Sequence, residues 1–193
     1  MSKTNIAIFA SGSGSNAEKI IAHFDKHDNI QVSLIISNNK DAFVLQRGKN
    51  HNIQTQVFSK KEFHSQDKIL ACLKSHEIDF IILAGFLLLI PQKMTIEFKD
   101  RIINIHPALL PKYGGKGMYG HHVHQAVFDN FEKKSGMTIH LVNEKYDEGK
   151  ILFQDKVELL STDTPDIIGK KVLALEHKHF APVVEKYITN FAV

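Results

Sequence analysis

What the sequence lacks limits where the protein works and which chemistry it can use. Cysteine occurs once, at Cys72, so the chain offers no disulfide framework and no cysteine-rich metal site, which is typical of a reducing compartment. No uninterrupted apolar stretch reaches the ~18 residues that a membrane-spanning helix needs. The N-terminus also lacks the long apolar region and the small-residue cleavage site of a signal peptide. We therefore expect a cytoplasmic protein with no membrane partner.

The charge balance has no large excess of either sign. Lys and Arg number 24 against 21 Asp and Glu, and the formal net charge of +3 is well short of the basic excess typical of nucleic-acid-binding proteins. With 193 residues and 43% hydrophobic content, the chain is large enough for one domain with a sizeable core. We expect a single domain over residues 1–193, present as a monomer or weak homodimer, that binds small molecules and no nucleic acid.

Short β-branched runs alternate with helical patterns along the first half of the chain. The pattern predicts strands at 5–10, 31–37, 53–58 and 80–84, and helices at 17–27, 42–50 and about 61–76. This rhythm favours an α/β fold, a doubly wound and mostly parallel sheet with helices on both faces.

The second half breaks this rhythm. A short helix at 92–98 and a strand at 101–105 precede a glycine-rich loop at 109–120 and a helix at 121–133. Residues 137–143 and 151–160 predict an antiparallel strand pair. Thr164 and Pro165 predict the N-cap and first residue of a long final helix. That helix has an expected packing face of Ile168, Val172, Leu175, His179 and Val183.

A glycine-rich turn follows the first strand. Gly12 and Gly14 lie where unpaired backbone N–H groups and the positive end of a helix can hold a phosphate, and Ser15 and Asn16 add donors. The segment also matches the dinucleotide pattern G-x-G-x-x-A, but that pattern needs an acidic residue at the end of the second strand, where this chain has Ser-Asn-Asn-Lys at 37–40. A monophosphate is favoured, while a purely structural turn and a nicotinamide-dependent oxidoreductase stay open as alternatives.

Polar residues close the strand that ends at His106. Asn104 and His106 share one face by alternation, at the carboxyl end where open α/β sheets bind ligands. Asp147 lies in a polar turn and gains importance if it reaches His106, because a carboxylate would raise the imidazole pKa and orient the ring. From the residues alone, a structural histidine and a solvated turn aspartate are the favoured alternatives. His121, His122 and His124 lack the spacing of a zinc motif, and we expect a helix start there.

Four motifs together carry a family resemblance over nearly the whole chain. They are GSGSN at 12–16, LAGF at 83–86, NIHPALLPKY at 104–113 and YDEG at 146–149. In this order and spacing they resemble the folate-dependent formyltransferase family, and within it the phosphoribosylglycinamide formyltransferases of purine synthesis.

The same family includes enzymes with other formyl acceptors. Methionyl-tRNA formyltransferases carry a second domain of about a hundred residues, which has no room here, and formyltetrahydrofolate hydrolases carry a preceding regulatory module. The lack of both favours transfer from 10-formyltetrahydrofolate, as cosubstrate, to glycinamide ribonucleotide, without a metal. Another folate-dependent formyltransferase, the hydrolase and a catalytically silent ligand sensor stay open as alternatives.

The resemblance implies a role for each matching residue. It implies that Asn104, His106 and Asp147 are catalytic. Binding of glycinamide ribonucleotide falls to Gly12, Ser13, Gly14, Ser15, Asn16, Gly85, Pro107 and, at the ribose, Glu176. Binding of the folate falls to Phe86, Leu87, Leu88, Leu89, Ile90, His140, Asn143, Glu144 and Tyr146. The chain departs from the family at Leu88, where a basic side chain is frequent, at Leu173, and in its extra glycines after Tyr113.

The implied mechanism is attack of the substrate amine on the formyl carbon. The resulting oxyanion would be stabilised by the Asn104 amide and a protonated His106. Asp147 would hold His106 and help relay the proton from the amine to the departing folate nitrogen.

Overall fold

The computed structural model describes residues 3–65 and 67–191, and the chain divides into two compact units, Met1–Ile103 and Asn104–Val193. The prediction of one domain over 1–193 stays a prediction. The hydrogen-bonded strand order is β3-β2-β1-β4-β5-β6-β7. The strands are β1 (Thr4–Phe9), β2 (Ile30–Ser37), β3 (Gln54–Val57), β4 (Phe80–Leu83), β5 (Ile102–His106), β6 (Lys134–Leu141) and β7 (Ile151–Glu158). The helices are α1 (Ser15–Phe24), α2 (Val44–Asn50), α3 (Lys60–Ser65), α4 (Asp67–Ser75), α5 (Gln92–Glu97), α6 (His121–Asp129) and α7 (Pro165–Phe191).

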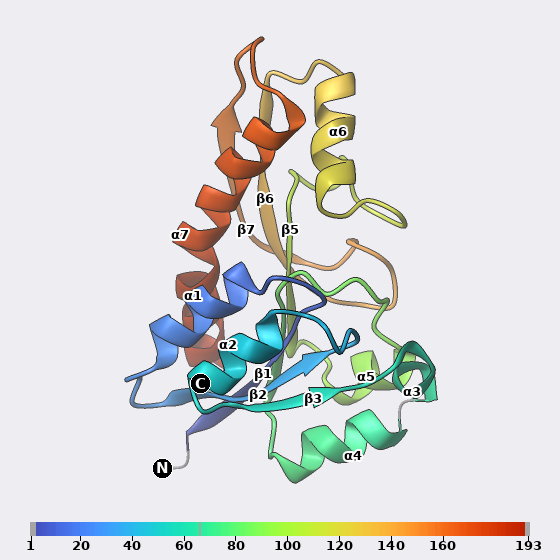
Figure 1. The fold of residues 1–193 in the computed structure, drawn as a ribbon, viewed down its shortest axis with the longest axis vertical. Coiled ribbons are helices and arrows are strands. Elements are labelled where there is room, and N and C mark those ends of the chain that lie inside the picture. The colour runs from blue at the N-terminus through green and yellow to red at the C-terminus, as the bar shows by residue number, and fades with distance from the viewer. Residues whose placement is uncertain (1–2, 66, 192–193) are drawn as a thin grey trace. The chain divides into compact units, whose positions relative to one another are not determined.

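The first unit is a parallel sheet with helices packed against it. β1 pairs parallel with β2 and with β4, and β2 pairs parallel with β3. All four residues of β4 are buried, as expected for a strand covered on both faces. α1 and α2 lie side by side against β2 (Figure 1). The parallel arrangement predicted from the alternating pattern is confirmed.

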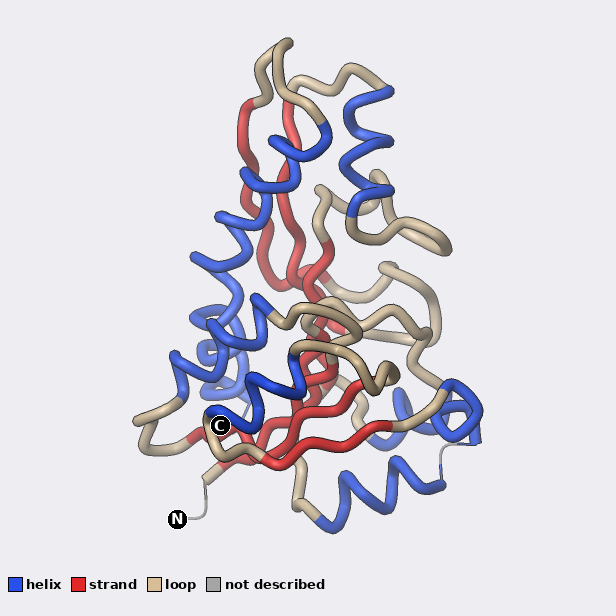
Figure 2. Tube along the Cα trace, in the orientation of Figure 1, coloured by secondary structure: helices blue, strands red, loops and turns tan. Residues whose placement is uncertain are grey.

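The second unit contains an antiparallel ribbon covered by a long helix. β6 and β7 pair antiparallel from Lys134 opposite Glu158 to His140 opposite Ile151. α7 packs along both strands and against α6 (Figure 2). Seven of the eight residues of β6 are buried, which makes this strand a rigid support for side chains that project from it. The predicted antiparallel pair and final helix are confirmed.

Two details of the predicted helices are wrong. α6 ends at Asp129, four residues before the predicted 133, and Phe131 then takes φ 52°, which a continuing helix does not allow. In α7 the buried residues recur mainly at every fourth position, whereas the predicted members Leu175, His179 and Val183 are half-buried. Because each four-residue step rotates by about 40° more than one full turn, the buried stripe winds around the helix. The buried residues are Ile168, Val172, Glu176, Phe180, Ala181, Val184 and Ile188.

The predicted helix at about 61–76 corresponds to α3 and α4, and residue 66 between them lies outside the described residues. Within the described part of the chain, no helix is both long and apolar enough to cross a membrane.

Candidate active site

Four polar side chains of the second unit form one continuous cluster. Asn104 Nδ2 lies 3.1 Å from His140 Nε2, and His140 Nε2 lies 3.6 Å from Asp147 Oδ1. The other carboxylate oxygen, Asp147 Oδ2, lies 3.5 Å from His106 Nδ1. β5, β6 and the turn before β7 therefore bring together the three residues predicted to be catalytic and one predicted folate ligand. The approach of Asp147 to His106, which the sequence left open, is present.

The glycine-rich loop holds the Asp147 carboxylate. The backbone N–H of Gly115 donates a hydrogen bond to Asp147 Oδ2 at 2.9 Å. A Cβ atom added at Gly114 would lie 3.2 Å from the Asp147 Cβ and 2.6 Å from Leu110 Cδ2. A larger residue at 114 would press on Asp147 and Leu110, so Gly114 allows the loop to approach Asp147 closely. Sequence reasoning identified the loop but missed this contact.

His106 has an acceptor on each side of its ring. Its Nε2 lies 2.8 Å from the backbone carbonyl oxygen of Tyr113, to which it donates, and its Nδ1 faces Asp147. His106 as a whole residue is 4% exposed. Tyr113 itself takes φ 58°, in the left-handed region that few non-glycine residues adopt. No residue-type pattern signals a backbone acceptor, and the sequence did not reveal this one.

The surroundings of His106 and of Asp147 lower both pKa values, for different reasons. Burial lowers the pKa of His106, an effect that the Asp147 charge and the Tyr113 carbonyl oppose and that the neighbouring His140 reinforces. Burial acts to raise the pKa of Asp147, but contacts with His140, the His106 charge and the Gly115 N–H outweigh burial and lower the pKa. An ionised Asp147 therefore faces a largely neutral His106 at neutral pH. The protonated His106 expected at the oxyanion stage stays a prediction.

His140 orients the Asn104 amide. The Nδ1 of His140 lies 2.8 Å from the Leu141 carbonyl, an acceptor, so Nδ1 carries the hydrogen in the neutral ring. The Nε2 atom then accepts one hydrogen of the Asn104 amide. The second amide hydrogen can be donated to a ligand.

A buried threonine anchors the loop that follows His106. Thr138 Oγ1 donates to the Ala108 carbonyl at 2.6 Å and accepts from the Leu110 N–H at 3.0 Å. The Gln154 amide adds bonds of 3.0 Å to the Leu110 carbonyl and 2.8 Å to the Thr138 hydroxyl. These contacts tie the loop to β6 and β7. The sequence did not single out Thr138, whose only signal is a polar residue within an apolar strand.

The predicted phosphate turn lies between β1 and α1 in the first unit. Gly14 has φ 70° and precedes Ser15, the first residue of α1. A Cβ atom added at Gly14 would lie 2.6 Å from the Val44 side chain, so only glycine fits. Arg47 donates from Nε to the Ser13 carbonyl at 2.8 Å and pairs with Glu18 at 2.8 Å. The turn is confirmed as a rigid strand-to-helix turn, and its ligand stays a prediction.

The predicted folate-binding segment also belongs to the first unit. The Phe86 ring packs against Phe9 and Phe63, with ring centroids 5.3 Å and 5.1 Å apart, respectively. Ser11 accepts from the Leu87 N–H at 3.0 Å, and its own N–H donates to the Gly85 carbonyl at 3.0 Å. Sequence reasoning missed Ser11, which lies two residues after the end of β1.

The anchored segment exposes apolar side chains on one part of its length. Leu87 is 50% and Leu89 37% exposed, whereas Ile90 is buried. Exposed leucines on a fixed backbone suit a flat apolar ligand.

The other predicted residues have varied environments. Glu176 is buried on α7, and Pro107 is half-buried. Asn143 Oδ1 accepts from the Lys145 N–H at 2.9 Å, which shapes the turn that leads to Asp147. Glu144 and Tyr146 are exposed there.

The three histidines near 121–124 lie at the start of α6, as predicted. The described residues contain no group of three or more His, Cys, Asp or Glu side chains placed to hold a metal ion.

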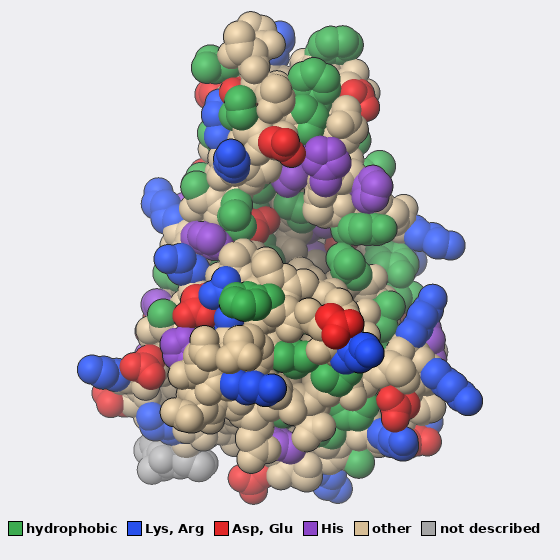
Figure 3. All heavy atoms as spheres, viewed as in Figure 1, with side chains coloured by type: hydrophobic (Ala, Val, Ile, Leu, Met, Phe, Trp, Pro, Cys, Tyr) green, Lys and Arg blue, Asp and Glu red, His purple; other side chains and the backbone are tan. Residues whose placement is uncertain are grey.

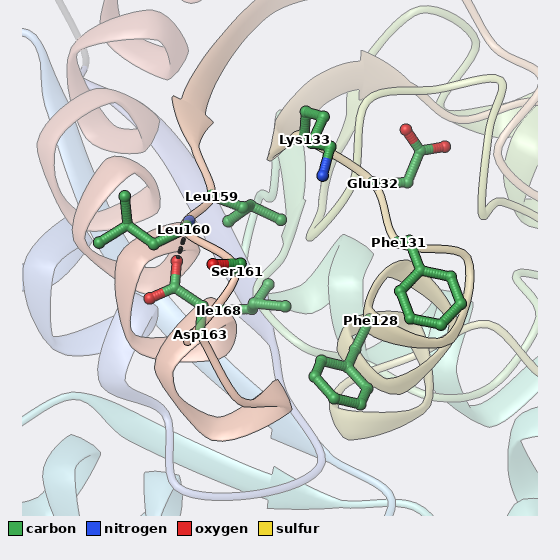
Figure 4. A pocket seen from close by; sticks show the side chains of 9 residues that line it. All are labelled: Phe128, Phe131, Glu132, Lys133, Leu159, Leu160, Ser161, Asp163 and Ile168. Carbon is green, nitrogen blue, oxygen red and sulfur yellow. Dashed lines mark hydrogen bonds between the residues drawn. The ribbon is translucent and has the colours of Figure 1, made fainter.

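A separate hollow of about 100 Å³ lies near the end of α6 and the start of α7 (Figure 4). Its rim carries exposed apolar side chains, including Phe128, Phe131 and Leu160. Figure 3 shows hydrophobic side chains reaching the surface in this upper part of the second unit. None of the residues that the sequence assigned to a site lines this hollow, so we place the candidate active site at the His106 cluster.

Comparison with known proteins gives a consistent match. A family model described as formyl transferase matches residues 4–184. The chain is 42% identical over 188 residues to the chloroplastic phosphoribosylglycinamide formyltransferase of Arabidopsis thaliana, covering 94% of this chain and 64% of that protein. It is 34% identical over 190 residues to the phosphoribosylglycinamide formyltransferase of Haemophilus influenzae, covering 96% of this chain and 87% of that protein. The chain thus spans less than two thirds of the length of the Arabidopsis relative.

Solved structures agree with the fold. The crystal structure of phosphoribosylglycinamide formyltransferase from Brucella melitensis matches with a TM-score of 0.86 at 35% identity, covering 96% of this chain and 95% of that one. The enzyme of the same name from Bacillus halodurans matches with a TM-score of 0.87 at 34% identity, covering 95% and 94%. The predicted α/β fold, a mostly parallel sheet with a C-terminal antiparallel pair and a long final helix, is confirmed.

Proposed function

The chain belongs to the formyl transferase family, and on that premise we propose that it transfers the formyl group of 10-formyltetrahydrofolate to the amine of glycinamide ribonucleotide. The observation that carries the proposal is the contact chain from Asn104 through His140 and Asp147 to His106. It combines an oriented amide donor, an ionised carboxylate and a buried imidazole. The nicotinamide-dependent alternative gains no support from the family match.

Asn104 and His106 act on the oxygen of the formyl group. The neutral amine forms a bond to the formyl carbon, and the carbonyl oxygen becomes an oxyanion. The free hydrogen of the Asn104 amide and the positive charge of a protonated His106 stabilise that negative charge. Loss of one such donor typically lowers the rate by about 10²–10³-fold.

Asp147 and His106 move the proton that the reaction must transfer. The attacking nitrogen loses a proton, and the folate nitrogen gains one as its bond to the formyl carbon breaks. A developing oxyanion raises the affinity of His106 for a proton, and the adjacent Asp147 carboxylate stabilises the resulting imidazolium. The neutral resting state of His106 lets it accept this proton, directly or through water.

The substrate contacts are proposals of the same kind. We assign the phosphate of glycinamide ribonucleotide to residues 12–16, flanking contacts to Gly85 and Pro107, and the ribose to Glu176. The folate is assigned to residues 86–90 together with His140 and the 143–146 turn, and no metal takes part. The fixed backbone at Gly14 and Phe86 supports these assignments. We also propose a cytoplasmic location and a monomer or weak homodimer.

The test is a reaction with both substrates and product identification. Purified protein mixed with glycinamide ribonucleotide and 10-formyltetrahydrofolate should release tetrahydrofolate and yield the formylated ribonucleotide. Omission of the ribonucleotide should stop release. Release of tetrahydrofolate together with formate, in the absence of the ribonucleotide, would instead indicate a formyltetrahydrofolate hydrolase.

A further inference from the structure

A partly exposed carboxylate is linked to His106 through a tyrosine. Glu132 Oε1 accepts hydrogen bonds from the Tyr113 hydroxyl at 2.9 Å and from Lys112 Nζ at 2.9 Å. The backbone carbonyl of the same tyrosine accepts from His106 Nε2 at 2.8 Å. Figure 4 shows the Glu132 carboxylate pointing away from the Phe131 ring of the hollow. The two ends of Tyr113 therefore connect Glu132 with the candidate catalytic ring.

The backbone of Tyr113 needs such a tether. Its φ of 58° is unfavourable for a residue that carries a bulky side chain, so surrounding contacts must maintain it. Burial and the Glu132 contact raise the pKa of the Tyr113 phenol to about 12, so the hydroxyl remains a donor. Bonds from Lys112 and Tyr113 lower the pKa of Glu132, so the acceptor is charged. A charged acceptor makes the tether stronger than a bond between neutral groups.

We propose that Glu132 is a positioning residue for His106, acting through the Tyr113 hydroxyl to hold the Tyr113 carbonyl against Nε2. With the tether broken, the backbone of Tyr113 can relax and turn its carbonyl away. His106 then loses one of its two acceptors and can rotate out of line with Asp147. The catalytic consequence rests on the proposed function, whereas the effect on the His106 ring does not.

Other groups near the ring set the background for a pH measurement. Asp147 faces Nδ1 from the turn before β7, His140 acts on the ring from β6, and His124 interacts with it electrostatically from α6. The Tyr113 carbonyl acts to raise the pKa of His106. Its removal is therefore expected to lower that pKa further, with these three neighbours unchanged.

The test uses Tyr113→Phe and Glu132→Ala, with Glu158→Ala as the matched control. Glu158 also pairs with a lysine, Lys134 at 3.1 Å, but we assign it no link to the cluster. Each test variant should lower kcat roughly fivefold, the worth of about one hydrogen bond, with little change in KM for either substrate. The double variant should fall no further than either single one, because both break the same link. Glu132→Gln, which keeps an acceptor for the hydroxyl, should recover most of the activity.

Nitrogen NMR of the His106 imidazole gives a readout that needs no activity. Both test variants should lower the pKa of His106 and reduce the hydrogen population on Nε2, while Glu158→Ala should change neither. An unchanged His106 titration in folded Tyr113→Phe, or a Glu132→Ala variant that matches the control, would overturn the inference. A wild-type protein without formyl transfer would refute the proposed function, but the NMR result would still decide this one.

Discussion

Asp147 combines more contacts than any other proposed catalytic residue. Its backbone takes φ 55°, its Oδ2 accepts from Gly115, and its two oxygens approach His140 and His106. Because its pKa is lowered, it is ionised at neutral pH. Replacing this aspartate with asparagine removes the charge and leaves the shape of the side chain almost unchanged.

Asp147→Asn should leave the fold intact and lower kcat by roughly 10²–10⁴-fold, the usual range for loss of a proton-transfer partner. An amide keeps an acceptor for Gly115 but cannot stabilise a protonated His106. Steady-state kinetics and a thermal melt measure the two effects. Glu148→Gln, a neighbouring exposed carboxylate in the same turn, is the control and should retain activity.

Gly14→Ala should destabilise the first unit by about 1–3 kcal/mol, because the backbone has a left-handed φ at this position and the added Cβ would collide with Val44. It should also raise KM for the ribonucleotide if residues 12–16 hold its phosphate. Gly12→Ala is the matched control, since nothing lies within 4 Å of its added Cβ, and should stay within about 0.5 kcal/mol of wild type. Equal stability of the two variants in urea titrations would contradict the role given to Gly14.

At the scale of elements, β6 is the support of the candidate active site. His140 projects from it toward Asn104 and Asp147, and Thr138 anchors the loop that carries Tyr113. A strand buried along most of its length moves little, so both contacts stay in register. The geometry of the cluster is therefore tied to the packing of β6 against β7 and α7.

Thr138→Val should cost about 1–3 kcal/mol of stability, since the swap keeps the shape but leaves buried loop groups without their partner. It should also lower kcat, because the loop from Ala108 to Tyr113 loses its anchor. Urea unfolding and kinetics test both effects. Thr55→Val on the edge strand β3 serves as the control and should change neither. A Thr138 variant as active and stable as wild type would show that the loop is held by other contacts.

At the scale of the whole molecule, the buried His106 and the half-buried His124 make stability depend on pH. Burial lowers the pKa of His106 and of His124, so the unfolded chain binds protons at these sites before the folded protein does. Stability should be fully present above about pH 6.5 and should fall as the pH drops toward the lowered folded values. Asp147 contributes no loss in this range, because its lowered pKa keeps it ionised.

Urea unfolding at about pH 7.5 and about pH 5.5 measures this effect, and the protein should be less stable at the lower pH. His124→Gln, which removes one of the two groups without touching the proposed catalytic residues, should reduce the difference. A wild-type protein equally stable at both pH values would contradict the lowered pKa values of His106 and His124.

The sequence predicted the elements that local patterns determine and missed contacts between distant residues. The apolar run at 80–84 and the glycine turn at 12–16 predicted β4 and the β1–α1 turn closely. The end of α6 was wrong because helical periodicity continues past Asp129, where the backbone of Phe131 changes direction. Ser11 and Thr138 were missed because their partners lie many residues away and no spacing rule connects them.

The residues of the candidate site were also predicted only in part from the sequence. Alternation alone placed Asn104 and His106 on one face, but only the resemblance singled out Asp147. The structure joins Asp147 to His106 through a turn whose conformation no residue pattern encodes. A backbone acceptor such as the Tyr113 carbonyl is invisible to any argument from residue type.

We propose that this chain transfers a formyl group and that Asp147 and His106 together move the proton of the reaction. The most direct measurement compares wild type and Asp147→Asn for tetrahydrofolate release from 10-formyltetrahydrofolate and glycinamide ribonucleotide, with binding of both substrates measured by calorimetry. Wild type should release tetrahydrofolate only with the ribonucleotide present, and the variant should bind both substrates but turn over at least about a hundredfold more slowly. Equal turnover by the two proteins, or no release by folded wild type, would contradict this proposal.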